Sequence, residues 1–189
     1  MKTKLIFLLI LGAMTLTFNI SAQPKKTSGA KKILVAYYSH SGNTQAVANQ
    51  IKEATGSDMF RIETLKAYPQ EYNALVEQAK KEVESGYKPV IKGKVNDMDS
   101  YDIIFVGSPN WWGTIAPPVA TFLSNYDLAG KTIIPFITHE GSRMGRSAGD
   151  IKKLCPRSTL LEGLPIRGSN AANARNDIKR WLQEIKITR

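Results

Sequence analysis

Cysteine is nearly absent from this sequence of 189 residues, because Cys155 is the only one. A single cysteine excludes an intramolecular disulfide and any metal cluster held by cysteines. We expect Cys155 to be a small apolar filler near the end of a helix. The sequence also has no internal repeat and no low-complexity tract. Residues 31–189 have the length of one α/β domain and can bury a substantial core.

Several patterns that carry chemistry are missing as well. The sequence has only two histidines, His40 and His139, and no Ser-His-Asp order, zinc-ligand spacing or pair of carboxylates goes with them. No Gly-x-Gly-x-x-Gly follows a predicted strand, so a second nucleotide site is not expected. We therefore predict neither a catalytic side chain nor a metal site.

The N-terminus has no long hydrophobic run, because its apolar stretch covers only residues 5–16, after Lys2 and Lys4. That stretch is too short for a comfortable transmembrane helix and is typical of a secretory signal peptide. No cysteine lies near the expected cleavage point, which excludes the lipoprotein route. We predict a signal peptide over residues 1–22, a solvated linker over residues 23–30, and export to the periplasm. An uncleaved N-terminal membrane anchor is the alternative.

Acidic residues are too few to balance the basic ones. The 26 Lys and Arg residues exceed the 16 Asp and Glu residues, which gives a formal net charge of +10. Removal of residues 1–22 takes away two lysines and no acid, leaving 24 basic and 16 acidic residues, a formal +8. A basic surface favours encounter with acidic partners. We expect a partner protein with an acidic surface or peripheral contact with an anionic membrane, and no nucleic acid.

The sequence does contain a regular alternation of strand and helix patterns. Nearly continuous apolar runs predict buried strands at residues 33–38, 101–107 and 131–138, and shorter patterns predict strands at 58–63 and 159–162. Helices are predicted over residues 45–54, 71–84, 117–125, 147–154 and 170–185, and residues 87–98 read as irregular. This alternation predicts an α/β three-layer sandwich, with a five-stranded parallel sheet of order 2-1-3-4-5 and helices on both faces.

The loop after the first strand is rich in residues with hydroxyl or amide groups: Ser39, Ser41, Asn43 and Thr44. Gly42 permits a tight turn there. Because a helix follows, its unpaired first-turn N–H groups and its dipole make the loop an anion site. No Lys or Arg occurs in residues 33–51, whereas a nucleoside triphosphate loop would carry a lysine. The loop predicts a site for one phosphomonoester; a hydroxyl-rich N-cap is the alternative.

Two further loops are expected at the same edge of the sheet, where such folds bind ligands. Trp111 and Trp112 are adjacent in the predicted loop at residues 108–113, so they cannot both lie on one helical core face. Two large aromatics there need a flat partner or an apolar pocket. The alternative is that one packs into the core and the other is exposed. The third loop, residues 138–142, reads Thr-His-Glu-Gly-Ser.

These three loops resemble those of the flavodoxin family, in the same order and after the corresponding strands. Ser-His-Ser-Gly-Asn-Thr is similar to the family's phosphate-loop signature, and the resemblance covers residues 32–187. It implies FMN as the cofactor. The phosphate contacts that it implies are Ser39, His40, Ser41, Gly42, Asn43 and Thr44. The flavin-ring contacts that it implies are Pro109, Asn110, Trp111, Trp112, Gly113, Thr138, His139, Glu140 and Gly141.

The resemblance implies an electron-transfer protein that cycles FMN between redox states and works with a redox partner protein. The alternative is an FMN-dependent reductase of NAD(P)H or quinone type on the same fold, and a third hypothesis is a flavin-free binding module. We expect His40 and His139 to form hydrogen bonds or to contact the cofactor. Flavodoxins are commonly strongly acidic, whereas this chain is basic, and Glu140 and Arg143 stand where small residues are expected.

Overall fold

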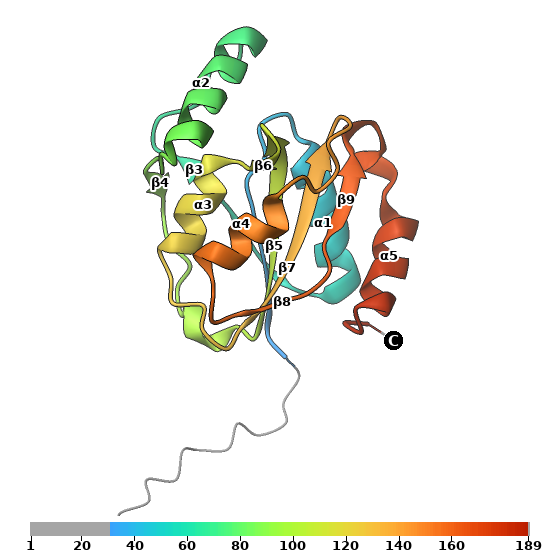
Figure 1. Cartoon of the computed structure of the whole chain (residues 1–189). Helices are drawn as coiled ribbons and strands as arrows, with labels where there is room; N and C mark the ends of the chain where they lie inside the picture. Colours follow the sequence, from blue (N-terminus) through green and yellow to red (C-terminus); the bar gives the residue numbers. More distant parts are fainter. Residues whose placement is uncertain (1–30, 189) are drawn as a thin grey trace, which may run out of the picture. The chain divides into compact units, whose positions relative to one another are not determined.

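The structure is a computed structural model that describes residues 31–188; the predicted signal peptide and linker lie outside the described residues. Its central feature is a parallel sheet with strand order β2-β1-β5-β7-β8 (Figure 1). The strands are β1 (Ile33–Tyr37), β2 (Asp58–Arg61), β5 (Ile103–Trp111), β7 (Thr132–His139) and β8 (Thr159–Leu160). β9 (Leu164–Arg167) pairs with the second half of β7. The predicted α/β class and the predicted order 2-1-3-4-5 are confirmed.

The fifth strand is split into β8 and β9, and the prediction of one strand over residues 159–162 missed the second part. β8 pairs with Thr132 and Ile133, and β9 pairs with residues 136–139. The N–H of Leu161 donates to the carbonyl of Ile133 at 3.0 Å, so the backbone groups of Ile133 point toward the outer strand. Alternate residues of a strand point the same way, so the backbone groups of Pro135 also point toward the outer strand. Because proline has no N–H to donate, the ladder is interrupted there. The outer strand crosses the gap with one extra residue, as in a β-bulge.

Four helices cover the two faces of the sheet and give the predicted three layers. α1 (Asn43–Thr55) and α5 (Arg175–Glu184) cover one face. The start of the helix predicted over residues 170–185 is instead a 3-10 helix, η2 (Gly168–Asn173), which precedes α5. The core on this face includes Val47, Ile51, Phe105, Phe136 and Ile178. α3 (Pro117–Ser124) and α4 (Ser147–Leu154) cover the other face. The core there includes Ile104, Val106, Val119, Phe122 and Ile151.

The segment between β2 and β5 departs from this plan. β3 (Glu63–Thr64) and β4 (Ile91–Lys92) form a separate antiparallel pair, and η1 (Met98–Ser100) is a short 3-10 helix, so residues 87–98 are less irregular than predicted. α2 (Tyr72–Ser85) begins after Glu71, whose carboxylate accepts hydrogen bonds from the first-turn N–H groups at 2.8 and 2.6 Å. Only Ala79 of α2 is buried. Figure 1 shows α2 reaching beyond the end of the sheet toward which β7 and β9 point.

Cys155 is buried at the C-terminal end of α4, as predicted, and it is a free thiol. Burial raises the pKa of this thiol to about 11, so the side chain is protonated and packs as a small apolar group. Within residues 31–188, no helix is both long enough and apolar enough to span a membrane.

Candidate functional site

The phosphate-type loop lies between the end of β1 and the start of α1. α1 begins at Asn43, two residues earlier than predicted, and Gly42 is its N-cap with φ 93°. That left-handed conformation favours glycine. The hydroxyl of the buried Ser39 accepts a hydrogen bond from the N–H of Gly42 at 3.1 Å, which fixes the turn. The first-turn N–H groups of a 13-residue helix therefore point out of a small neutral loop.

Thr44 has a structural position rather than an open one. Its side chain is buried, and its hydroxyl lies 2.8 Å from the hydroxyl of Thr138, which is also buried. This hydrogen bond joins the first turn of α1 to the end of β7. Thr44 thereby sets the distance between the first and third predicted loops.

A cleft of about 730 Å³ opens between these loops, at the carboxyl end of the sheet. Twelve of the fifteen residues assigned to the cofactor by resemblance line it: His40, Ser41, Asn43, Pro109, Asn110, Trp111, Trp112, Gly113, Thr138, His139, Glu140 and Gly141. The other three, Ser39, Gly42 and Thr44, shape the loop behind the lining. The resemblance therefore selected segments that the fold brings together.

The second loop is a β-hairpin, which corrects the prediction of a loop over residues 108–113. β5 continues through Trp111, and β6 (Thr114–Ile115) pairs back on it in antiparallel orientation. The two turn residues, Trp112 and Gly113, have φ of 51° and 82°. Two positive φ values are the mark of a type I′ turn, and a tryptophan there is strained. The side-chain oxygen of Asn110 accepts from the N–H of Gly113 at 3.0 Å and supports the turn.

The two tryptophans have different surroundings. Trp111 packs edge-on against Tyr38 and Tyr68, with ring centroids 5.5 and 4.9 Å apart, and its ring lies 6.3 Å from that of His40. Trp112 is 47% exposed, and its indole N–H donates to the carbonyl of Val76 in α2 at 3.0 Å. The alternative that one ring packs inward while the other is exposed describes this arrangement. Both rings still line the cleft.

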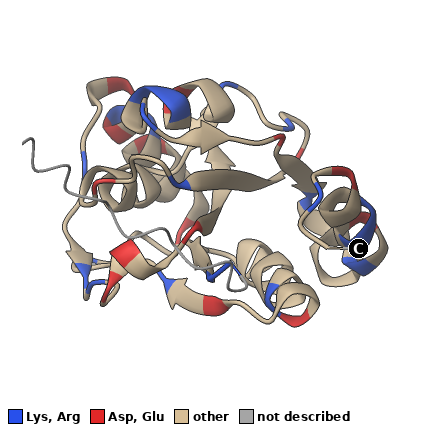
Figure 2. Cartoon of the chain, turned by 90° about the horizontal axis from the view of Figure 1, so that it is seen from below, with Lys and Arg blue, Asp and Glu red and all other residues tan. Residues whose placement is uncertain are grey.

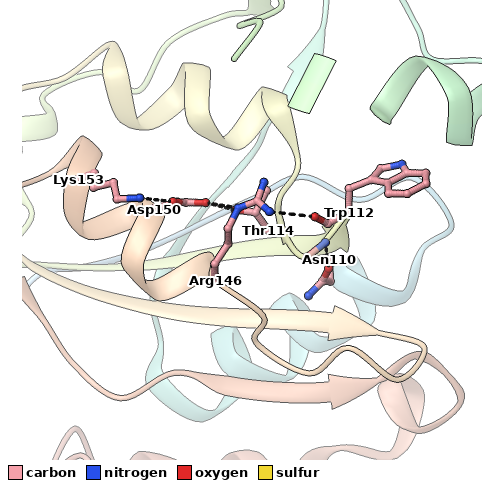
Figure 3. Close-up of polar contacts among 7 residues, drawn as sticks. Asn110, Trp112, Thr114, Arg146, Asp150 and Lys153 are labelled. Carbon is pink, nitrogen blue, oxygen red and sulfur yellow. Dashed lines mark hydrogen bonds and ion pairs between the residues drawn. The ribbon is translucent and has the colours of Figure 1, made fainter. Parts of the chain in front are cut away.

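A network of polar contacts fixes the hairpin to the start of α4 (Figure 3). The guanidinium of Arg146 bonds Asp150 at 3.0 Å and the carbonyl of Trp112 at 3.4 Å. Thr114 and Lys153 also donate to Asp150, at 2.8 and 3.0 Å. Burial raises the pKa of the Asp150 carboxyl, but these three hydrogen bonds outweigh burial and leave the pKa below its usual value. Asp150 is therefore ionised at neutral pH and anchors the turn.

The third loop places one buried polar atom without a partner at the cleft. The Nδ1 atom of His139 is buried and has no hydrogen-bond partner among the described residues. Burial lowers the pKa of this imidazole, Arg143 and Arg167 lower it further, and Glu140 opposes them. His139 is therefore neutral at neutral pH. Unpartnered buried polar atoms are uncommon and are often found where a ligand binds.

Glu140 turns toward the phosphate-type loop. A Cβ added to Gly168 would lie 2.1 Å from a carboxylate oxygen of Glu140 and 2.6 Å from the side-chain nitrogen of Asn43. Both side chains therefore crowd the same glycine at the start of η2. The carboxylate lies on the α1 side of the cleft, and Gly168 leaves the space that both groups occupy.

The sequence interpretation missed one whole side of the cleft. Besides Ser142, the unpredicted lining residues lie in α2: Tyr72, Leu75, Val76 and Ala79. Their spacing of three, four and seven residues is the signature of one helix face. That pattern was present in the sequence, but an amphipathic face is normally assigned to the core alone. Here Leu75 packs against the edge of the core, and the same face also lines the cleft.

Comparison with known proteins supports the resemblance to the flavodoxin family by sequence as well as by structure. The flavodoxin family model matches residues 32–185. A crystal structure of a protein from Bacteroides eggerthii, assigned as a flavoprotein, superimposes with a TM-score of 0.74 at 32% identity and covers 83% of this chain and 99% of that one. A Lactobacillus acidophilus flavoprotein in complex with FMN gives a TM-score of 0.64 at 24% identity, covering 80% of this chain and 99% of that one.

A curated relative from Cupriavidus metallidurans, named NAD(P)H dehydrogenase (quinone), is 35% identical over 92 residues. The match covers 49% of this chain and 45% of the relative, so the chain spans less than half of that enzyme's length. The family model, in contrast, covers residues 32–185, which is nearly all of the described part of the chain. The chain belongs to the flavodoxin family.

Proposed function

We propose that the chain binds FMN in the cleft and acts as an electron-transfer flavoprotein. The observation that carries the proposal is the neutral anion site at the start of α1, which opens into a cleft with aromatic and amide walls. No Lys or Arg occurs in residues 33–51, so the site suits one phosphate rather than a triphosphate. The FMN complex of the Lactobacillus acidophilus flavoprotein supports the choice of flavin.

The residues present fit this cofactor. The backbone N–H groups of the loop, with Ser41 and Asn43, would hold the phosphate. The hairpin at Trp111 and the third loop would hold the ring, and the unpartnered Nδ1 of His139 is a polar atom that the ring could satisfy. Bound FMN would supply the redox chemistry, while the protein orients it and sets its electronics.

The test is the absorbance spectrum of the protein purified without added cofactor, followed by identification of any released flavin. Ser41→Ala with Asn43→Ala should then weaken FMN much more than riboflavin, because each lost bond to the charged phosphate is worth about 1.5–3 kcal/mol. Equal affinity of the parent and the double variant for both flavins would refute the phosphate assignment. A colourless protein that takes up no flavin would favour the flavin-free binding module.

The second candidate is an FMN-dependent reductase of NAD(P)H or quinone type, which the name of the Cupriavidus metallidurans relative favours. Stopped-flow reduction separates the two candidates. The carrier predicts slow direct oxidation of NAD(P)H by the isolated protein, and rapid, saturable turnover of NAD(P)H to a quinone would establish the reductase instead.

The proposed partner of the carrier is a redox protein with an acidic surface, and peripheral contact with an anionic membrane is also proposed. Figure 2 shows Lys and Arg positions spread over several sides of the domain, with acidic positions among them. The net positive charge of the whole domain, rather than a single basic patch, would therefore guide the encounter with an acidic partner. Electron exchange with such a partner should slow as salt rises, because salt screens exposed charges.

The proposed location is outside the cytoplasm, after removal of residues 1–22. Lys2, Lys4 and the apolar stretch at residues 5–16 support this proposal. Intact-mass measurement of the protein from fractionated cells is the test. A cytoplasmic holoprotein that still carries Met1 would refute export.

A further inference from the structure

Exposed large hydrophobic side chains gather on one segment of the chain. Among the described residues they are Leu65, Tyr72, Tyr87, Val90 and Trp112. The first four lie between β2 and β5, and the indole N–H of Trp112 donates to a carbonyl of α2 in the same segment. Of the five, only Tyr72 and Trp112 line the cleft. The proposed flavin site therefore does not account for the exposure of Leu65 and Val90.

Leu65 and Val90 stand side by side on the outer face of the β3–β4 pair. Antiparallel pairing sets Thr64 opposite Ile91, and the N–H of Leu65 continues the register by donating to the carbonyl of Val90 at 2.8 Å. Thr64 is buried, and Ile91 packs against the core on the α3 side of the sheet. Because side chains alternate between the two faces of a strand, Leu65 and Val90 point outward. They are 66% and 65% exposed.

Basic residues surround this apolar pair. Residues 61–66 and 88–94, which include β3 and β4, contain five basic residues and one acidic one, all exposed: Arg61, Lys66, Lys88, Lys92, Lys94 and Glu63. The carboxylate of Glu63 lies 3.7 Å from Nε of Arg61. Five basic residues against one acidic residue leave a formal charge of +4. We refer to residues 61–66 and 88–94 as the basic ribbon.

The composition of the basic ribbon fits a lipid surface better than a protein surface. Protein interfaces are enriched in aromatic residues and arginine and depleted in lysine, and leucine and valine seldom dominate their binding energy. The basic ribbon has two exposed aliphatic side chains and four lysines. A lysine can lay its apolar stem along a hydrophobic surface while its ammonium reaches a polar headgroup.

We propose that the basic ribbon is the surface through which the domain docks on an anionic lipid bilayer. Leu65 and Val90 would enter the boundary between headgroups and acyl chains, and the lysines would meet the lipid phosphates. The proposal rests on the membrane contact included in the proposed function and assigns that contact to one surface. The net charge of the whole domain would attract the chain to the lipid, and the basic ribbon would set the orientation in which it docks.

The test attaches a nitroxide spin label to Val90→Cys in the FMN-loaded protein. Burial raises the pKa of Cys155 to about 11, so that thiol should stay unlabelled. The vesicles are phosphatidylcholine, with or without one third of phosphatidylglycerol. On the anionic vesicles, electron paramagnetic resonance should show more access of the label to oxygen, which dissolves in lipid, and less to a nickel chelate, which stays in water. The label reports its own position, so the result does not depend on removal of residues 1–22.

An exposed residue of α5 provides the matched control position. α5 covers the face of the sheet opposite to α3, and the basic ribbon packs on the α3 side. The same label on Asn176→Cys should therefore remain accessible to the nickel chelate on both kinds of vesicle.

Two pairs of lysine variants with the same net charge separate local from general attraction. In the labelled Val90→Cys background, Lys66→Gln with Lys92→Gln should weaken docking of the label roughly ten- to thirtyfold, because each basic residue near an anionic membrane strengthens binding about fivefold. Lys52→Gln with Lys179→Gln removes two exposed charges from α1 and α5 and should weaken it about threefold or less.

Leu65→Thr tests the apolar contribution in the same labelled background. It removes a side chain that is 66% exposed and keeps a residue that suits a strand, so folding should be unaffected. Docking should weaken roughly three- to tenfold, because less apolar surface leaves water on contact with the lipid. None of the substituted residues lines the cleft, so the FMN affinity of every variant should equal that of the parent.

The outcomes separate this proposal from the flavin function. A protein that takes up no FMN refutes the flavin function, and the label experiment can still be carried out on it. A residue-90 label that stays in water, enters both kinds of vesicle equally, or responds equally to the two lysine pairs refutes the docking surface, and a surface that binds an acidic protein instead would leave the label in water. Entry that is confined to anionic vesicles and to residue 90, and is weakened mainly by the Lys66 and Lys92 pair, establishes the docking surface.

Discussion

Gly145→Ala tests how closely the β5–β6 hairpin, with Trp112 and Gly113 in its turn, must pack against the segment before α4. A Cβ on Gly145 would lie 2.2 Å from the carbonyl oxygen of Gly113 and 2.9 Å from its carbonyl carbon. Both are backbone atoms and cannot rotate away. Gly145 also has φ +52°, a conformation that other residues rarely adopt. The substitution therefore has two separate costs, one conformational and one steric.

The magnitude follows from these two costs. A left-handed conformation costs a non-glycine residue about 1–2 kcal/mol. Overpacking against well-ordered atoms costs about 1–3 kcal/mol more. The free energy of unfolding should therefore fall by about 2–5 kcal/mol. Relief of the clash by movement would break the bond from the N–H of Arg146 to the Gly113 carbonyl, which is 2.8 Å long. The hairpin would then shift, and FMN affinity should fall.

Gly56→Ala is the matched control. Gly56 has φ +66° at the end of α1, and an added Cβ there meets no atom within 4 Å. The free energy of unfolding of Gly56→Ala should therefore fall only by the conformational cost, about 1–2 kcal/mol, and its FMN affinity should not change. Denaturant unfolding and flavin titration of both variants give the comparison. Equal losses of stability at the two glycines would refute the steric argument.

Three further predictions concern the cleft. Thr44→Val leaves the Thr138 hydroxyl unpaired in a buried place, so unfolding should become easier by about 1–3 kcal/mol, whereas Thr44→Ser should retain most of the stability in the same denaturant assay. Glu140→Gln removes an exposed negative charge beside the phosphate-type loop, so FMN should bind roughly two- to fivefold more tightly while riboflavin is unaffected; unchanged FMN titrations would remove Glu140 from the site. The pKa of His139 is lowered in the folded protein, so the unfolded chain binds the proton first, and stability should fall as pH drops below about 6.5. His139→Gln should remove that part of the pH dependence, as measured by denaturant unfolding across pH 5–7.

The central strands could be predicted from sequence because burial on both faces leaves an unmistakable pattern. β1, β5 and β7 are nearly continuous runs of apolar, often β-branched residues, and their starts agree with the prediction to within two residues. α4 was predicted with both ends correct, at residues 147–154. Local pattern was enough for these elements, and the expected strand order 2-1-3-4-5 agrees with the observed one.

The hairpin that ends β5 could not be predicted, because its turn lacks the usual signal. Two-residue turns with two positive φ values normally carry Asn-Gly or Asp-Gly. Here the first position is Trp112, whose bulk disfavours that conformation, and its support comes from Asn110 and from Arg146, 34 residues away. A turn that depends on a distant side chain has no local signature.

The split fifth strand has a similar explanation. Pro135 is visible in the sequence, but it lies in a run that predicts a central strand, and its effect falls on the neighbouring strand rather than on its own. The bulge between β8 and β9 becomes predictable only once β7 is known to be their partner. The missing N–H of Pro135 in β7 therefore produces the break between β8 and β9 in the neighbouring strand.

α2 shows that an apolar helix face can be recognised in the sequence without revealing that it lines a ligand cleft. Full burial of a leucine or valine side chain is worth about 1.5–3 kcal/mol, and a core helix obtains that amount at each position of its apolar face. In α2, Leu75 and Val76 are only half-buried and Tyr72 is largely exposed, so much of this free energy is not realised in the chain alone. A ligand held against Tyr72, Leu75 and Val76 in the cleft would bury the same atoms and recover this free energy. The incomplete burial of the helix and the capacity of the cleft for a ligand are therefore two descriptions of one surface.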